Sequence, residues 1–454
     1  MDKSLIDADA VRPDFVPKDA YLSREFAELE AKYLWPRVWQ MACREEEIAS
    51  PGQYVTYDIA NETIVILRDK EGEIRAFHNV CPHRGRRLAS GCGQAAELVC
   101  RFHGWRFGLD GKCTYVSDRE DWDGALTDDY LALHPVKTGS WGGFVFINMD
   151  PDCEPLEKFL DPVNRLCDRF ELEKMRFTWY RTAIAPCNWK IPVEGFSESY
   201  HVQQSHAHML QFMQDYSASA AYGKHGAFWY PTPPEGVAPI SPSVRLKRNK
   251  PATETRKYAI DFLDINCDDV GAIVSERTRD VVKERLLAEV AADAPPEEVA
   301  MKMGEFQRQA AIDDGAGWPE GLTADYVEES RDTWTVFPNF IFVHAMIDSI
   351  IVYRARPNGH DPESCLFDVW SLMRYAPGKE PPLEREFFSH IMDADWRRIL
   401  RQDFEHFEEV QRGIRSMAYR GHRTNPKQEV IISNHARALR AFLAEGVRRD
   451  EAAA

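Results

Sequence analysis

The sequence predicts an α+β fold in which a small all-β module precedes a larger domain with a central antiparallel sheet surrounded by helices. Short alternating runs of apolar and polar residues, separated by tight turns, fill residues 38–155 and are typical of β-strands. Strand-like runs return between residues 333 and 373, where the last three are spaced closely enough to form a meander. Residues 268–318 have the apolar spacing of helices. Strands and helices therefore segregate along the chain, as in α+β proteins.

Composition places the chain among ordinary globular enzymes. It has 454 residues, of which 44% are hydrophobic and 28% charged. The net charge of −17 argues against nucleic acid or an anionic membrane surface as the main partner, and no run approaches the ~20 apolar residues of a membrane span. The N-terminus has no apolar signal core, so we expect a cytoplasmic protein. We therefore look for metal ligands among its ten cysteines rather than for a disulfide framework.

Changes in pattern divide the chain into three segments. Residues 1–37 are predicted to form a helical N-terminal segment, residues 38–155 the all-β module, and residues 156–454 the larger domain. Within the larger domain, residues 268–318 are predicted to form an insert of two exposed helices, which a Pro-Pro pair interrupts. No phosphate-binding loop or dinucleotide-binding fingerprint occurs, so we do not expect this chain to bind a nucleotide cofactor itself.

Two further helices are predicted near the C-terminus. The longer begins near Leu383 and runs, with breaks allowed, to about Ser416, and the shorter spans residues 433–446. A strand over residues 180–188 is expected just before the segment that carries the first candidate ligands of a mononuclear metal.

Two short loops of the all-β module carry a metal-binding pattern. Cys81 and His83 lie in the first loop, and Cys100 and His103 lie in the second after sixteen intervening residues. Two thiolates and two imidazoles could hold structural zinc, but zinc sites usually take a cysteine pair from one segment and a histidine pair from another. One cysteine and one histidine from each loop suit a Rieske [2Fe–2S] cluster, in which two cysteines bind one iron and two histidines bind the other. We therefore predict a Rieske cluster here.

A second candidate metal site lies in the segment from Glu194 to His206. His201 and His206 are five residues apart, and Glu198 precedes His201 by three. Positions three apart share a helix face, so we expect Glu198 and His201 to project together. A spacing of five does not fit a regular turn and predicts a helix end or a π-type distortion between the histidines. Two imidazoles with a carboxylate from elsewhere make the facial triad of non-haem iron oxygenases.

Together these motifs resemble the catalytic α subunit of the Rieske non-haem iron oxygenases, the ring-hydroxylating dioxygenase family. The resemblance extends from about Leu34 to Ser416 and implies a helix-grip-like catalytic domain behind the Rieske module. Four segments carry it, and the first two are highly specific together. They are Cys81–Gly85, Cys100–Trp105, Asn188–His206 and Gln402–Gly413.

By this resemblance the third ligand of a mononuclear Fe(II) comes from the late helix. The match to Val410–Gly413 places this ligand at Asp403, which completes an implied triad with His201 and His206. The residues alone leave three competing carboxylates on the same helix, Glu405, Glu408 and Glu409. The resemblance also implies that Asn188 lies near the iron as a supporting residue.

The sequence departs from the family pattern at Glu198. Members usually have aspartate at this position, where it hydrogen-bonds a ligand histidine of its own chain and a cluster histidine of the neighbouring subunit. By position these partners are His201 and His103 of the partner subunit. Glutamate keeps the charge but adds a methylene, so we expect the bridge to reroute or the subunits to sit farther apart; an ion pair with an arginine is the alternative. If the bridge holds, the departure indicates a substrate outside the usual aromatic hydrocarbons.

The leading hypothesis for function is a terminal oxygenase component that dihydroxylates an aromatic ring with O2 and electrons from NAD(P)H. Because no NAD or flavin motif is visible, a separate ferredoxin, a flavin reductase or both must deliver electrons singly to the cluster. The alternative is a monooxygenase that hydroxylates a C–H bond or demethylates an N- or O-methyl substrate, including quaternary amines. Glu198 is the reason to weigh it. A Rieske electron carrier without oxygenase chemistry would lack the triad.

The resemblance also implies a head-to-tail α3 trimer, with α3β3 assembly through a small β subunit left open. A small hydrophobic or aromatic substrate is expected in a pocket above the iron. Candidate lining residues are Met209, Phe212, Met213, Phe337, Phe342, Ile351 and Tyr353. Arginines crowd the two cluster loops, and we expect them either to steer an acidic ferredoxin or to pair across subunits. They are Arg84, Arg86, Arg87, Arg101 and Arg106.

Overall fold

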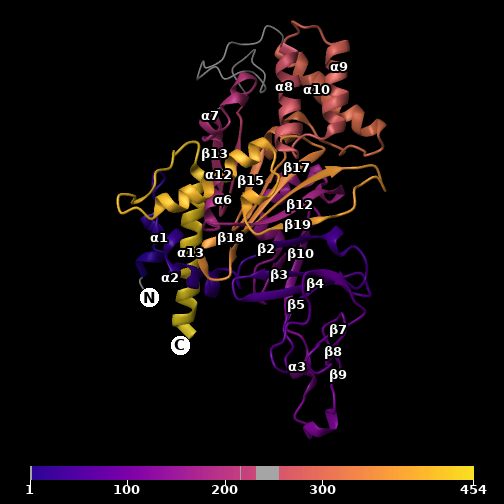
Figure 1. The fold of residues 1–454 in the computed structure, drawn as a ribbon, viewed down its shortest axis with the longest axis vertical. Coiled ribbons are helices and arrows are strands. Elements are labelled where there is room, and N and C mark those ends of the chain that lie inside the picture. Colours follow the sequence, from indigo (N-terminus) through magenta and orange to yellow (C-terminus); the bar gives the residue numbers. More distant parts are fainter. Residues whose placement is uncertain (1–2, 215, 232–254, 454) are drawn as a thin grey trace. The chain divides into compact units, whose positions relative to one another are not determined.

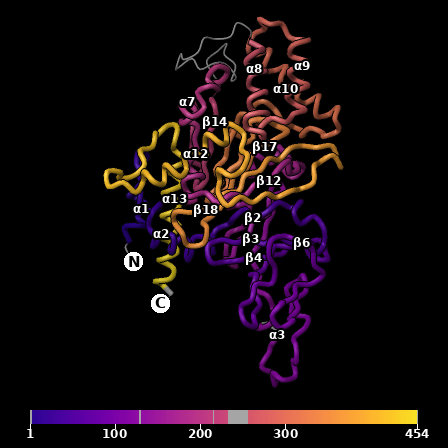
Figure 2. The backbone as a smooth tube through the Cα atoms, in the orientation of Figure 1, coloured from indigo at the N-terminus to yellow at the C-terminus, as the bar shows by residue number. Residues whose placement is uncertain are grey.

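The computed structural model describes residues 3–214, 216–231 and 255–453. Figure 1 shows their helices and strands, and Figure 2 shows the path of the backbone in the same orientation. The chain divides into two compact units, each described here by itself: Glu28–Asn164, and Met1–Ala27 with Arg165–Ala454. Among the described residues, no helix combines the length and the apolar character that crossing a membrane requires.

Strands are the main regular structure of the smaller unit, which confirms the β module. Its described residues form a seven-stranded antiparallel sheet in the order β2-β11-β10-β5-β4-β3-β6 and a three-stranded sheet in the order β7-β8-β9. The strands are β2 Gln40–Arg44, β3 Gln53–Ile59, β4 Glu62–Arg68, β5 Ile74–His78, β6 Cys92–Gln94, β7 Leu98–Val99, β8 Arg106–Phe107, β9 Cys113–Tyr115, β10 Pro135–Trp141 and β11 Phe144–Asn148. The short helices are α3 Asp128–Leu131 and α4 Leu156–Leu160.

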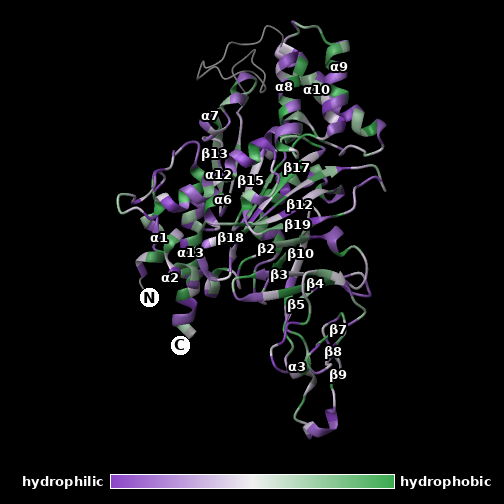
Figure 3. Cartoon of the chain, in the orientation of Figure 1, coloured by the Kyte–Doolittle hydropathy of each residue, from purple (hydrophilic) through white to green (hydrophobic). Residues whose placement is uncertain are grey.

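The larger unit is built on an eight-stranded sheet of described residues in the order β13-β14-β15-β16-β17-β18-β12-β19. All neighbouring strands are antiparallel except β12 and β19. The bounds are β12 Met175–Ala185, β13 Ala218–Tyr222, β14 His225–Trp229, β15 Thr333–Val336, β16 Phe340–Val343, β17 Ser349–Asn358, β18 Asp361–Arg374 and β19 Arg385–Phe388. The predicted meander is thus confirmed as β16, β17 and β18. Most residues of β15 to β18 are buried, and Figure 3 shows where hydrophobic residues occur along the chain.

Helices surround this sheet. The insert contains two helices as predicted, and a third, α8, packs against them through an apolar cluster that includes Leu263, Val282 and Phe306. Asp348, fully buried at the start of β17, accepts hydrogen bonds from Ser275, among other partners, and so anchors the insert to the sheet. The helices are α1 Asp19–Leu22, α2 Arg24–Leu29, α5 Val163–Cys167, α6 Lys190–Gly195, α7 Val202–Ser205, α8 Thr255–Ile265, α9 Glu276–Glu289, α10 Pro296–Asp313, α11 Ala324–Ser330, α12 Arg398–Ile414 and α13 Val430–Ala453.

The predicted start of the late helix near Leu383 is wrong. The segment first forms β19, an edge strand beside β12, and the helix α12 begins only at Arg398. Between them Ile391 and Trp396 are buried, and the indole N–H of Trp396 donates to the carbonyl of Ile391. Strand pairing and the burial of these two residues therefore take the place of the first part of the predicted helix.

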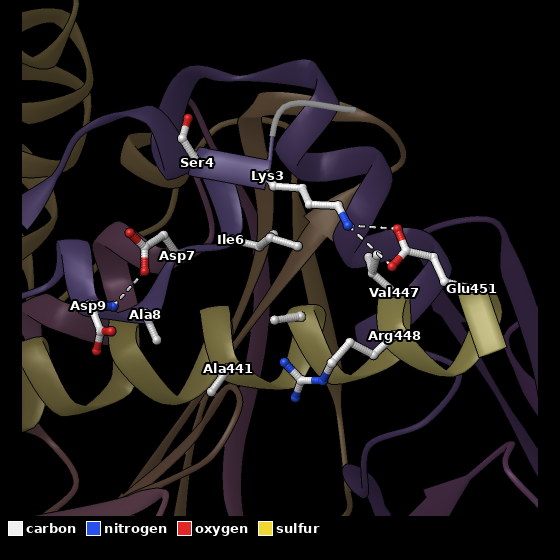
Figure 4. A pocket seen from close by; sticks show the side chains of 11 residues that line it. Lys3, Ser4, Ile6, Asp7, Ala8, Asp9, Ala441, Val447, Arg448 and Glu451 are labelled. Carbon is white, nitrogen blue, oxygen red and sulfur yellow. Dashed lines mark hydrogen bonds and ion pairs between the residues drawn. The ribbon is translucent and has the colours of Figure 1, made fainter.

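The last helix is longer than the predicted 433–446, because α13 extends over Val430–Ala453. The N-terminal turns of the chain lie along it (Figure 4), where the ammonium of Lys3 pairs with Glu451 at 2.8 Å and Ile6 is buried. A two-stranded ladder of β1, Val16–Pro17, with β20, Gly421–His422, ties the same N-terminal segment to the chain before α13. The N-terminal residues thus belong to the larger unit.

Candidate metal centres

The two cluster loops repeat one backbone geometry. The N–H of Gly85 donates to the carbonyl of Cys81 at 3.0 Å, and the N–H of Gly104 donates to the carbonyl of Cys100 at 2.9 Å. Both glycines have positive φ, 73° and 74°, a conformation that other residues adopt only at a cost. The spacing from cysteine to glycine therefore sets a tight turn, which presents the intervening side chains to one side.

The four candidate ligands gather at the tips of these loops. Cys81 and Cys100 are 2% and 1% exposed within an apolar cluster, and the rings of His83 and His103 lie 4.5 Å apart. Trp105 stacks on His83 at 4.8 Å. The Nδ1 atoms of both histidines are buried and have no hydrogen-bond partner among the described residues. Two buried thiols and two unpartnered imidazole nitrogens form a donor set that fits a [2Fe–2S] cluster with mixed ligands.

Burial sets the ionisation of this site. It raises the pKa of the Cys81 thiol to about 11, and the neighbouring Cys100 thiol adds to the shift. A thiol binds metal only after it has lost its proton, so the positive charge of the metal is needed to hold both sulfurs ionised at this buried site. Without a metal, the apolar surroundings therefore keep the Cys81 thiol protonated at neutral pH.

An aromatic cluster brings the second set of candidate ligands together. Phe196, at the end of α6, stacks on Tyr353 of β17 with ring centroids 3.9 Å apart, and Tyr353 stacks on Phe367 of β18 at 5.9 Å. From α12, Phe404 and Phe407 meet Phe367 edge-on at 5.5 and 5.7 Å. Each such pair contributes about 0.5–1.5 kcal/mol beyond area burial. Packing against Tyr353 and Phe367 on the sheet therefore sets the positions of both the segment after α6 and helix α12.

This packing places His201, His206 and Asp403 at one point. One ligand atom from each lies within 4.8 Å of the others. Oδ1 of Asp403 is 2.7 Å from Nε2 of His206 and 3.4 Å from Nε2 of His201. The histidines flank the single turn α7, Val202–Ser205, so the predicted helix end between them is confirmed. Two imidazoles and one carboxylate at this separation fit the facial triad of a mononuclear iron.

The buried face of α12 selects Asp403 from the four carboxylates that the sequence left open. Asp403 is 8% exposed and lies in register with the buried Phe404 and Phe407. The other three pair with arginines on the outer side of the helix: Glu405 with Arg401, and Glu408 and Glu409 with Arg412. The apolar spacing of the helix therefore distinguishes the candidate ligand from a solvated face.

Glu198 contacts His201, although through a loop rather than a helix face. Its Oε1 lies 2.6 Å from Nδ1 of His201, and its Oε2 accepts from the backbone N–H of His201 at 3.2 Å and of Tyr200. Within the described part of the chain, no arginine pairs with it. The carboxylate thus holds the outer nitrogen of the ring and leaves Nε2 facing Asp403, an arrangement that orients metal-binding histidines.

Gln402 is a supporting residue that the sequence reasoning missed. Its Oε1 lies 2.9 Å from Nδ1 of His206, where it mirrors Glu198 at the other histidine. Its place directly before Asp403 was the available signal, because neighbouring residues on a helix lie on adjacent faces.

Among the described residues, no contact joins Asn188 to the triad. Its side-chain amide donates to the carbonyls of Tyr21 at 3.2 Å and Pro362 at 2.7 Å, and its Oδ1 accepts from the N–H of Lys190 at 3.1 Å. These bonds fasten the start of α6 to the N-terminal segment and to β18. A role of Asn188 at the iron stays a prediction.

The carboxylates around the triad also set its charge. Burial alone would lower the pKa of His201, but Glu198 and Asp403 outweigh it and hold that pKa well above its usual range. Burial likewise opposes ionisation of Asp403, yet its contacts with His201 and His206 lower its pKa. The site therefore prefers positive charge beside an ionised Asp403, and a cation supplies such charge.

The other predicted surfaces differ in how far the structure supports them. All seven candidate pocket residues are buried, and burial alone does not distinguish a pocket from an ordinary core. The five arginines of the cluster loops are exposed. Arg87 pairs with Asp58 and Arg106 with Glu97, whereas Arg86 and Arg101 have no ion-pair partner among the described residues. The docking role of these arginines stays a prediction.

Comparison with protein families separates the same two regions. Residues 170–445 match the ring hydroxylating α subunit (catalytic domain), and residues 38–125 match the Rieske [2Fe–2S] domain. The first match alone covers more than half of the chain.

Comparison with individual proteins adds two relatives and one solved structure. The carnitine monooxygenase oxygenase subunit of Acinetobacter pittii (strain PHEA-2) is 32% identical over 195 residues, 42% of this chain and 52% of that protein. The glycine betaine monooxygenase oxygenase subunit of Pseudomonas aeruginosa (strain UCBPP-PA14) is 28% identical over 202 residues, 44% and 47%. The chain thus spans about half the length of the curated relatives it matches. A quaternary ammonium Rieske monooxygenase solved with L-carnitine shares the fold, with a TM-score of 0.62 at 20% identity over 95% of this chain and 97% of that one.

Proposed function

Because the chain belongs to the ring-hydroxylating α-subunit family and carries a Rieske domain, we propose that it is the oxygenase component of a monooxygenase acting on a quaternary ammonium compound. It is a Rieske non-haem iron oxygenase, with a Rieske cluster and a mononuclear iron as cofactors. The observation that carries the substrate class is the similarity to relatives named for carnitine and glycine betaine. Demethylation or C–H hydroxylation of a quaternary amine was the alternative expected from the sequence, and the relatives favour it over dihydroxylation of an aromatic ring.

The smaller unit would hold the Rieske cluster. Cys81 and Cys100 would hold one iron of the cluster, and His83 and His103 the other, through buried Nδ1 atoms that have no hydrogen-bond partner in the part of the chain that the structure describes. Trp105 covers one face of His83 and excludes water from it. Mixed ligation raises the potential of such a cluster above that of all-cysteine ferredoxins, which lets a separate ferredoxin or flavin reductase load it with electrons from NAD(P)H.

In the larger unit, His201, His206 and Asp403 would hold the mononuclear iron. When bound, the two cofactors together supply single electrons and the activation of O2. Glu198 and Gln402 fix the ring orientation and tautomer of the two histidines by occupying their Nδ1 atoms. The electron path that we propose joins the cluster of one subunit to the iron of the next in a head-to-tail trimer, with Glu198 at the bridge.

Charge supports a cationic substrate. The chain carries a net charge of −17, and a field of that sign raises the local concentration of small cations. A quaternary ammonium group keeps its charge at every pH, so this attraction does not depend on substrate protonation. We therefore expect the apparent affinity for substrate to fall as salt concentration rises.

The expected chemistry is hydroxylation of a carbon bonded to the quaternary nitrogen. One substrate, O2, two electrons and two protons give the hydroxylated substrate and one water. A hydroxymethyl group on a quaternary nitrogen then breaks its C–N bond, leaving the tertiary amine, formaldehyde and a proton. O2 is the oxidant in this reaction, and the reductase supplies the two electrons.

Turnover under 18O2 tests this proposal. The holoenzyme with a reductase would be given carnitine, glycine betaine, an aromatic acid and a polycyclic hydrocarbon. We expect a quaternary amine to be consumed and one 18O atom to enter the organic product or the formaldehyde released. Two 18O atoms in an aromatic diol would instead establish the dioxygenase. No substrate-dependent O2 uptake by a fully loaded enzyme would favour an electron carrier.

A further inference from the structure

A groove of about 380 Å³ opens beside the triad and carries polar groups that the ligand set does not use. Its lining includes Glu198, His201 and Asp403, and also Glu194, His422 and Glu429. The last three come from α6, from β20 and from the segment just before α13. A cavity of this size with several polar partners has room for ordered water. The groove therefore links a separate polar cluster to the site where O2 would react.

Glu194 is the most deeply placed member of that cluster. It is 8% exposed, and its Oε1 accepts a hydrogen bond from the hydroxyl of Tyr21. Its Oε2 faces Nε2 of His422 at 3.7 Å, and Lys190 also acts on its charge. Burial raises the pKa of Glu194 to about 8, against the opposing effects of Tyr21 and Lys190. The carboxyl thus holds a proton at neutral pH.

His422 faces Glu194 as a neutral group and does not compete for its proton. Burial lowers its pKa to about 4, so the ring is neutral, and its Nδ1 lies 2.8 Å from the hydroxyl of Tyr419. Its Nε2 is buried without a hydrogen-bond partner among the described residues and lies near Oε2 of Glu194. The protonated carboxyl of Glu194 therefore lies beside a neutral imidazole, and no charged partner draws the proton away on that side.

Glu429 connects this cluster to the triad side of the groove. Its carboxylate accepts from the backbone N–H of Asn425 at 2.5 Å. Burial raises its pKa to about 7, and the charges of Glu198 and His201 act on it. The same carboxylate acts on the charge of Glu194. Two protonatable acids thus lie along one groove, one buried and one nearer to solvent.

We propose that Glu194 is a proton-holding residue of the oxygenase, which supplies protons to the reaction site through the groove and is reloaded by way of Glu429. Reduction of O2 with insertion of oxygen consumes two protons for every two electrons, and a positioned acid supplies them faster than bulk water. The requirement holds for monooxygenation and dioxygenation alike. The inference therefore rests on the oxygenase class of the proposed function and not on the quaternary amine.

The first test needs neither iron nor substrate. In iron-free protein, infrared or carbon-13 NMR titration should show a carboxyl that loses its proton near pH 8 and is missing in Glu194→Gln. Because the pKa is raised on folding, this group stabilises the fold fully below about pH 4.5, and that stability is lost as pH rises to about 8. The variant should lose this part of the pH dependence of unfolding. A wild-type carboxyl fully ionised at pH 7 would overturn the proposal.

The second test is single-turnover O2 consumption by the chemically reduced holoenzyme. In the wild type the rate should fall as pH rises through about 8, because Glu194 then loses its proton. Glu194→Gln keeps an acceptor for Tyr21 but carries no acidic proton, so we expect a rate lower by about 100-fold without this alkaline limb. Glu405→Gln, on the exposed side of α12, should leave the profile unchanged.

A variant of Tyr21 keeps the test decisive if Glu194→Gln does not fold. The Tyr21 hydrogen bond lowers the pKa of Glu194, so Tyr21→Phe should move the alkaline limb to higher pH. A merely structural role would change the rate without moving that limb. An alkaline limb in the same place in Tyr21→Phe, or a wild-type rate and profile in Glu194→Gln, would falsify the proposal.

Discussion

The two candidate metal centres are assembled in different ways. In the smaller unit, two loops close on themselves, each through a cysteine carbonyl and a glycine N–H four residues later. In the larger unit, His206 and Asp403 are almost two hundred residues apart, and an aromatic cluster on the sheet brings their segments together. The first centre is a property of local sequence, and the second is a property of packing.

This difference indicates which substitutions should disrupt each centre. A loop centre depends on its ligands and on two glycines, since its hydrogen bonds are local. A packed centre depends in addition on residues that touch no ligand, such as Tyr353 and Phe367, because they fix the distance between elements. The predictions below separate these dependences.

The largest effect is expected when the packed centre loses its carboxylate. Asp403→Ala should abolish product formation and reduce the iron content from about three atoms per chain to about two, because two imidazoles alone bind iron poorly. The absorption of the cluster should persist. Glu405→Ala on the outer face of the same helix is the matched control and should keep all three iron atoms. Full iron content in Asp403→Ala would remove this residue from the triad.

The converse change removes the loop centre. Cys100→Ser should abolish the cluster absorption and reductase-dependent activity, yet leave the mononuclear iron in place, because the two centres lie in separate units. Cys92→Ser, an exposed cysteine of the same unit, is the control and should keep the cluster spectrum. Simultaneous loss of the cluster and of the mononuclear iron would show that the centres are not assembled independently.

A smaller effect should follow from a packing change that touches neither set of ligands. Phe404→Ala removes a ring that meets Phe196, Phe367 and Trp396, and should cost about 3–5 kcal/mol of unfolding free energy and weaken iron binding at the triad. Denaturant unfolding and iron titration measure both. The cluster spectrum should not change. Phe387→Ala, with a ring 63% exposed on β19, should be neutral, and an equal loss there would contradict the argument.

The smallest effect concerns the surface of the loop centre. Replacing Arg86 and Arg87 by alanine should lower the rate of electron transfer from an acidic ferredoxin roughly tenfold at low salt and reduce its salt dependence, because two exposed positive charges are lost. Stopped-flow reduction of the cluster measures this. Lys112→Ala is a control of equal charge type in the same unit. An unchanged rate would leave pairing between subunits as the role of these arginines.

The sequence by itself determined the loop centre and much of the fold. The spacing of Cys81, His83, Cys100 and His103 predicted the cluster because ligands within one hairpin-like loop are brought together by the turn that the loop must make. The all-β module, the meander and the two insert helices followed from periodicity, which reflects burial on one face or on both. The departure at Glu198 also pointed to the alternative substrate class that the relatives support.

Only the tertiary structure decided the rest. The residues of α12 left four carboxylates open until the family motif was matched, and only the packing shows that Asp403 lies on the buried face with Phe404 and Phe407. The helix predicted from Leu383 became an edge strand because pairing with β12 satisfied its backbone. Gln402, Glu194 and Tyr21 make their side-chain contacts with residues far away in the chain. Periodicity records which face is buried, whereas the identity of the facing residue depends on how distant segments pack.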